Sequence, residues 1–212
     1  MNDVRNDAGL GAVEVEPINR SALLVRGALA AGALYGSWSV SPLVRRAFAA
    51  QGSMNDVDVL NFALTLEYLE AAFYSEAAKR VPGLSGELAG YVKTFGGEEQ
   101  DHVDALSGAI KDLGGKPVEA PGVDFGDAFS STDSFLDLAI TFEDTGVSAY
   151  NGAAPMIESK DLLAVAGSIV QVEARHAAAV RHAAGEPAAP NAFGPTLGED
   201  QVLKAVQPFI AS

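Results

Sequence analysis

The chain has 212 residues and a mass of 21.9 kDa, and 48% of its residues are apolar whereas 20% are charged. This composition supplies a buried core and excludes wholesale disorder, and the length suits one domain of about 150 residues with appendages. Acidic residues outnumber basic ones 28 to 14. The resulting net charge of −14 argues against nucleic acid as a partner, because an acidic surface repels phosphate backbones. With no cysteine and three histidines, any metal site must consist mostly of carboxylates.

The N-terminal region has the order of a secretory signal. Residues 1–20 are polar and acidic and predict a disordered segment. Residues 21–50 contain an Ala/Gly-rich apolar stretch that ends in Ala47-Phe48-Ala49, which is typical of a cleavage site. Residues 19–23 also look like a twin-arginine motif that lacks its first arginine. The pattern predicts an exported or cell-envelope protein whose mature form begins near Gln51.

Two features of the same region favour another interpretation. The segment before Arg20 is net acidic, and Arg45-Arg46 lie on the side that would be translocated. The alternative is an uncleaved N-terminal helix that packs on the body of the protein or contacts a membrane. In that case the protein could also be cytoplasmic.

From residue 55 onward, apolar residues recur at spacings of three and four, which predicts four amphipathic helices. The expected helices cover residues 55–79, 85–113, 132–153 and 159–184. Asn55 suits the start of the first helix, and Pro82-Gly83 suits its end. The links within the first and last helix pairs are short, whereas a polar stretch over residues 116–131 joins the two pairs.

This arrangement predicts an all-α fold, an antiparallel four-helix bundle with one long crossover, over residues 54–185. Residues 186–212 form a proline-rich tail with a short C-terminal helix in this prediction.

Each of the four apolar stripes is interrupted near its middle by ionisable residues. They occur in the order Glu67, Glu99-x-x-His102, Glu143 and Glu173-x-x-His176. Residues three apart share one helix face, so each Glu-x-x-His pair points both side chains into the same volume. Four ionised glutamates in an apolar interior would be very costly without partners. Two divalent cations would balance their charge, with one histidine completing the ligands of each metal, and pairs of this kind lie about 3.5–4 Å apart.

The sequence also contains an internal repeat. Glu67 precedes Tyr74 by seven residues, as Glu143 precedes Tyr150, and the two Glu-x-x-His pairs are 74 residues apart. Two copies related by a pseudo-twofold axis would give each metal one Glu-x-x-His helix. The remaining carboxylates, Glu67 and Glu143, would then act as bridges. Tyr74, Tyr150 and Glu70 are candidates for the surrounding layer, where a phenol can donate to a ligating carboxylate.

These residues, together with the stretch from Asn61 to Tyr74, resemble the di-metal carboxylate site of the ferritin-like superfamily. The likeness extends over residues 55–210 and is strongest for bacterial ferritin-like domain proteins related to stress or desiccation-related proteins. It implies two iron ions, or alternatively manganese, held by Glu67, Glu99, His102, Glu143, Glu173 and His176, which would also be the catalytic residues.

The resemblance implies that the protein reacts with dioxygen or peroxide, as a ferroxidase or another oxidoreductase in iron or oxidative-stress handling. Ligands dominated by carboxylate oxygen suit iron or manganese. The alternatives are a dimanganese catalase-like enzyme and a non-catalytic stress-related protein with a vestigial metal site. Homo-oligomer formation is compatible with the resemblance, but the ligand motif does not encode it.

Overall fold

The computed structural model describes residues 55–211, which form five α-helices and two 3-10 helices. The α-helices are α3 (Asp56–Arg80), α4 (Gly86–Asp112), α5 (Thr132–Ala153), α6 (Lys160–Ala183) and α7 (Glu199–Val206), and the 3-10 helices are η1 (Ala154–Met156) and η2 (Gln207–Phe209). Each boundary of the four long helices lies within one residue of its prediction. The predicted disordered segment and the signal-like segment fall outside the described residues.

Local hydrogen bonds explain where the helices begin and end. Asn55 Oδ1 accepts a bond from the amide of Asp58, and the Asp58 carboxylate accepts one from the amide of Asn55, at 3.1 and 3.3 Å. This capping box satisfies amides that would otherwise lack partners in the first turn of α3. Ser131 and Ser159 cap α5 and α6 with a single bond each, because their side chains accept from the amides of Ser134 and Leu162. After α4 the backbone turns through Gly114 at a φ of +76°, a conformation that favours glycine.

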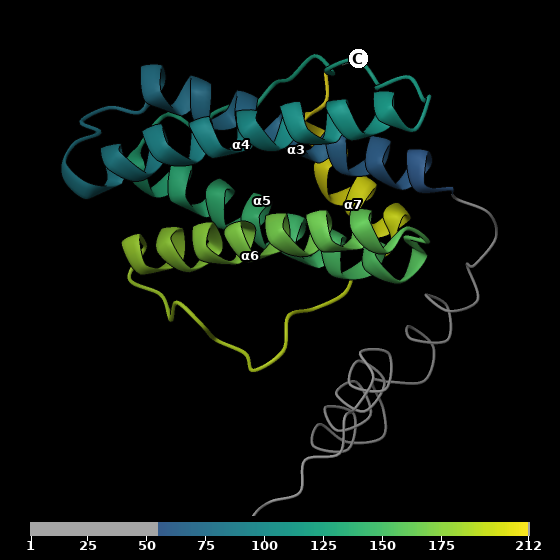
Figure 1. Ribbon diagram of the computed structural model, residues 1–212. Helices are drawn as coiled ribbons and strands as arrows, with labels where there is room; N and C mark the ends of the chain where they lie inside the picture. The colour runs from purple at the N-terminus through teal and green to yellow at the C-terminus, as the bar shows by residue number, and fades with distance from the viewer. Residues whose placement is uncertain (1–54, 212) are drawn as a thin grey trace, which may run out of the picture. The chain divides into compact units, whose positions relative to one another are not determined.

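The four long helices form the predicted all-α antiparallel bundle (Figure 1). Helix α3 packs along α4 and α5 along α6, and the two pairs meet through α3 with α5 and α4 with α6. Residues 113–131 connect the pairs, running from the end of α4 to the opposite end of the bundle, where α5 begins. Within the described residues no strand is present, and the single β-bridge joins Val123 to Ile210.

Two apolar clusters fill the bundle on either side of its middle. One cluster gathers aromatic rings around Phe73, whose ring centroid lies 5.3 Å from that of Phe135. The other contains Leu64, Leu106 and Ile169. On every long helix, the ionisable residues identified in the sequence lie between a member of one cluster and a member of the other. The bundle therefore surrounds a polar layer with apolar packing at both ends.

The crossover is anchored more firmly than its polar sequence indicated. Phe125 and Phe129 are buried, and their rings lie 5.4 and 5.3 Å from that of Phe73. The C-terminal tail pairs with the same segment, because Ala211 donates its amide to the carbonyl of Gly122 at 2.8 Å. Two aromatic side chains thus hold a stretch in which the sequence shows no periodic pattern.

Helix α7 covers the side of the bundle where α3 faces α5. Its Val202 and Val206 are buried in a cluster with Leu66, Leu69 and Ala149. This packing confirms the short C-terminal helix expected from the sequence. Among the described helices, none combines the length and the apolar character needed to cross a membrane.

Candidate metal centre

The six residues that interrupt the apolar stripes meet in the middle of the bundle. All four glutamates are completely buried, whereas His102 and His176 are 9% and 1% exposed. Two sets of four residues bring one ligand atom from each member within 4.8 Å of the others. The first set is Glu67, Glu99, His102 and Glu173, and the second is Glu99, Glu143, Glu173 and His176. The structure therefore contains two adjacent groups of donors that are compatible with a di-metal site.

The division of the carboxylates differs from the one expected. Glu99 and Glu173 belong to both sets, whereas Glu67 and Glu143 each belong to one. The expectation that Glu67 and Glu143 act as bridges is therefore wrong for this arrangement. The glutamates of the two Glu-x-x-His pairs lie at the centre of the cluster, and those of α3 and α5 lie at its ends.

The histidines face the carboxylates through Nδ1. His102 Nδ1 lies 2.9 Å from Glu173, 3.1 Å from Glu99 and 3.2 Å from Glu67. His176 Nδ1 lies 2.8 Å from Glu99, yet the two atoms are not aligned for a hydrogen bond. Each imidazole therefore directs one nitrogen at the same space as the carboxylate oxygens.

Five buried atoms of the cluster lack hydrogen-bond partners. They are Oε1 of Glu99, Oε2 of Glu143, both carboxylate oxygens of Glu173 and Nδ1 of His176. Buried polar atoms are rarely left unpaired, because each costs about 1–3 kcal/mol. Here the unpaired atoms converge from three helices on one another, as expected of ligands to a cation. The donor set of carboxylate oxygen and one imidazole per position therefore fits a di-metal carboxylate centre.

Two tyrosines cross the bundle to hold the end carboxylates. Tyr74 on α3 donates its hydroxyl to Oε1 of Glu143 on α5, and Tyr150 on α5 donates to Oε1 of Glu67 on α3, the latter at 2.5 Å. Each phenol satisfies one oxygen of its carboxylate and leaves the other facing the cluster. The two hydrogen bonds are reciprocal because the spacing from glutamate to tyrosine is the same in α3 and α5.

Crowding shifts the pKa values of the cluster strongly. Burial, together with the charges of Glu173 and Glu99, raises the pKa of Glu67 to about 8. Burial alone would raise the pKa of Glu99, but the facing imidazoles of His102 and His176 outweigh it and lower that pKa to about 2. Burial disfavours the charged imidazole of His102, but the facing carboxylates raise its pKa to about 12. Protons thus neutralise much of the cluster when no cation does so.

One residue with a role in the site was not identified from the sequence. Glu98 directly precedes Glu99 on α4, and its Oε2 accepts a hydrogen bond from Nε2 of His176 at 2.7 Å. In the neutral imidazole, this bond places the proton on Nε2 and leaves the lone pair of Nδ1 facing Glu99. The histidine that it binds lies 78 residues away in the chain. The only signal in the sequence is that Glu98 is a carboxylate next to a Glu-x-x-His pair.

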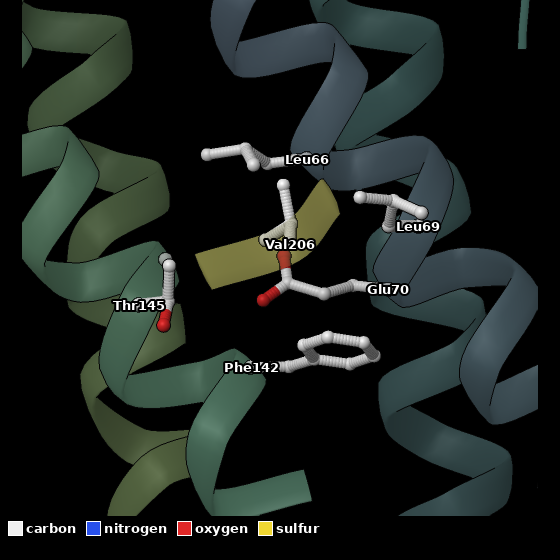
Figure 2. Close-up of a pocket in the computed structure, with 7 residues that line it drawn as sticks. Leu66, Leu69, Glu70, Phe142, Thr145 and Val206 are labelled. Atoms are coloured by element: carbon white, nitrogen blue, oxygen red, sulfur yellow. The ribbon is translucent and has the colours of Figure 1, made fainter. Parts of the chain in front are cut away.

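Glu70 occupies a neighbouring pocket instead of joining either set. It is 3% exposed and points between α3 and α5, among Leu66, Phe142 and Val206 (Figure 2). The pocket of about 10 Å³ has room for roughly one water molecule. A Cβ atom at Gly146 would lie 3.0 Å from Oε1 of Glu70, so a glycine at this position provides the space for the carboxylate. Burial, followed by the charges of Glu173 and Glu99, raises the pKa of Glu70 well above its usual range.

Replacement of Glu70 by methionine is expected to stabilise the metal-free protein at pH 8 by about 1–3 kcal/mol, because methionine keeps the length of the side chain and removes a buried carboxyl group. Urea unfolding in the presence of a chelator measures the change. The exposed Glu119→Met serves as the control and should change stability by less than about 0.5 kcal/mol. A destabilised Glu70→Met protein would mean that the carboxyl group holds a structural hydrogen bond.

The fold and the buried cluster together define a helical bundle with a candidate di-metal carboxylate centre. The chain belongs to the ferritin-like domain family, whose model matches residues 55–186. This match confirms the family resemblance indicated by the order of glutamates and histidines. A search of curated proteins finds no match.

A similar solved structure is that of a conserved hypothetical protein from Mycobacterium tuberculosis, with a TM-score of 0.55 and 19% sequence identity. The alignment covers 64% of this chain and 94% of that one. At this identity, the likeness shows the fold alone.

Proposed function

We propose that this protein is a di-iron carboxylate oxidoreductase that oxidises Fe(II) with dioxygen or peroxide. The observation that carries the proposal is the convergence of four buried glutamates and two Nδ1 atoms, five of whose atoms have no other partner. Glu67, Glu99, His102 and Glu173 would hold one iron, and Glu99, Glu143, Glu173 and His176 the other. Bound iron supplies the electrons for reducing the oxidant and open coordination positions for binding it.

The chain's own residues perform the remaining tasks. Tyr74 and Tyr150 orient Glu143 and Glu67, so that one oxygen of each carboxylate faces the centre. The two apolar clusters exclude bulk water from both ends of the layer, which strengthens electrostatic interactions inside it. The facing carboxylates raise the pKa values of His102 and His176, so the metal-free state favours the doubly protonated imidazoles, and a bound cation would take the place of one proton on each ring.

The small pocket at Glu70 supports a small oxidant in preference to an organic substrate. Its lining is mostly apolar and its volume is close to that of one water molecule. Dioxygen and peroxide are of comparable size, whereas a sugar or a nucleotide would require rearrangement of α7. The size of the pocket thus favours small oxygen species over larger organic substrates.

Metal analysis coupled to turnover tests the proposal. Protein expressed without chelators should contain about two iron ions per chain, oxidise added Fe(II), and consume dioxygen or peroxide in proportion. Manganese with rapid peroxide disproportionation would instead support a catalase-like enzyme. Protein that binds neither metal would contradict both enzymatic proposals and leave a structural role in stress as the remaining alternative.

A further inference from the structure

The two histidines of the centre are held differently, although the sequence repeat makes their positions equivalent. His176 donates from Nε2 to Glu98 at 2.7 Å, and its ring stacks on Phe95 with centroids 3.9 Å apart. For His102, residues 55–211 contain neither a partner for Nε2 nor a stacked ring. His102 is also the more exposed of the two, at 9% against 1%.

The difference follows from two substitutions within the repeat. A shift of 74 residues places Glu98 of α4 at the position of Val172 in α6, and Phe95 at the position of Ile169. Valine cannot accept a hydrogen bond from an imidazole, and isoleucine cannot stack on one. Helix α6 therefore lacks the two groups that would hold His102 in the way that Glu98 and Phe95 of α4 hold His176.

The two contacts prepare His176 for metal binding. A carboxylate that accepts from Nε2–H fixes the tautomer with its lone pair on Nδ1 and makes that nitrogen a stronger donor. The stacked Phe95 holds the plane of the ring, so less rotational freedom remains to be lost on binding. Nδ1 of His176 already lies 2.8 Å from Oε1 of Glu99, without a hydrogen bond between them.

We propose that the two metal positions are inequivalent and fill in order, the His176 position first, with Glu98 as the positioning residue that sets this order. The inference rests on the proposed function only in requiring that the centre binds divalent cations. It needs neither turnover nor a particular oxidant. The difference between the positions comes from Glu98 and Phe95, because the rest of the two ligand sets is matched residue for residue.

Calorimetric titration of the full metal-free chain with cobalt(II), which does not turn over, tests the order. Wild type should show two unequal binding steps. Glu98→Gln should weaken the tighter step about 10- to 100-fold, the range for losing a carboxylate partner of a ligating histidine. Val172→Glu, which offers His102 the missing carboxylate, should strengthen the weaker step.

Two further variants assign the steps to positions. Glu143→Gln should remove the tighter step and Glu67→Gln the weaker one, because each glutamate belongs to a single set. The exposed Asp101→Asn on α4 is the control and should change neither step. The metal-free melting temperature of Glu98→Gln should match that of wild type, whereas a merely structural role for Glu98 would lower it.

Different results overturn different statements. Two equal steps in wild type, or equal weakening of both steps by Glu98→Gln, would overturn the filling order and leave the metal centre in place. Loss of the weaker step in Glu143→Gln would reverse the assignment and also overturn the order. A wild-type chain that binds no cobalt(II) would overturn the proposed function together with this inference.

Discussion

Replacement of Glu173 by glutamine should abolish binding at both metal positions, because this carboxylate belongs to both ligand sets and neither of its oxygens has another partner. Wild type should gain about 2.7 kcal/mol of stability for each position whose metal is present at a hundred times its dissociation constant. For a chain of this size, each such gain corresponds to roughly 5 to 10 °C in melting temperature. Anaerobic thermal melts with and without Fe(II) should show the full rise in wild type and none in Glu173→Gln.

Two variants calibrate that result. Glu143→Gln should lose only one of the two increments, because Glu143 lies at the end of the cluster. Asp101→Asn, whose side chain is exposed on α4, should retain both. If Fe(II) raises the melting temperature of Glu173→Gln as much as that of wild type, Glu173 is not a ligand and the assignment of shared carboxylates fails.

The metal-free protein should lose stability as the pH rises from about 4.5 to 8. Glu67 has an ordinary pKa of 4.5 when unfolded and one of about 8 when folded, so within this interval the folded chain retains a proton that the unfolded chain releases. Stability therefore falls with rising pH, by roughly 5 kcal/mol for a shift of this size. The raised pKa of His102, about 12 against 6.5, acts in the same direction above pH 6.5.

Below pH 4.5 the trend should reverse. The pKa of Glu99 is lowered to about 2, so its contribution is present above 4.5 and lost as the pH falls toward 2. Urea unfolding at several pH values with chelator present should place the maximum near pH 4.5. Fe(II) should shift the maximum upward, because cations displace the same protons. A metal-free profile that Glu67→Gln leaves unchanged between pH 4.5 and 8 would show that another group causes the fall.

Much of the site could be predicted because each of its parts is visible within one helix. Glu67, Glu99, Glu143 and Glu173 interrupt apolar stripes, and a helix of period 3.6 then fixes the direction in which they point. The repeat further indicated that each half supplies one histidine. The caps and turns were equally local, since Asn55 and the glycine after α4 act within one turn of the chain.

The missed features all depend on how two helices lie against each other. Which carboxylates are shared depends on the relative axial positions of the four helices, which no single stripe encodes. The role of Glu98 cannot be found within its own helix because its partner, His176, lies on another helix. The burial of Glu70 depends on the glycine opposite it on α5, a relation between residues 76 positions apart. Likewise, Phe125 and Phe129 lie in a segment without a periodic pattern, and their burial depends on contacts with Phe73 of α3.

The C-terminal segment is attached to the bundle by α7 and by the backbone pairing that follows it. Helix α7 seals the side where Glu70 lies, yet behind it the chain is held by the pairing of Ala211 with Gly122 and of Phe209 with Asp124. We expect this segment to detach as one cooperative unit while the four long helices stay packed, because it follows them in the chain and local opening involves contiguous units. Entry of small molecules to the α3–α5 side would then be set by the free energy of this local detachment, and sequence changes in the last 14 residues would control it without altering any ligand.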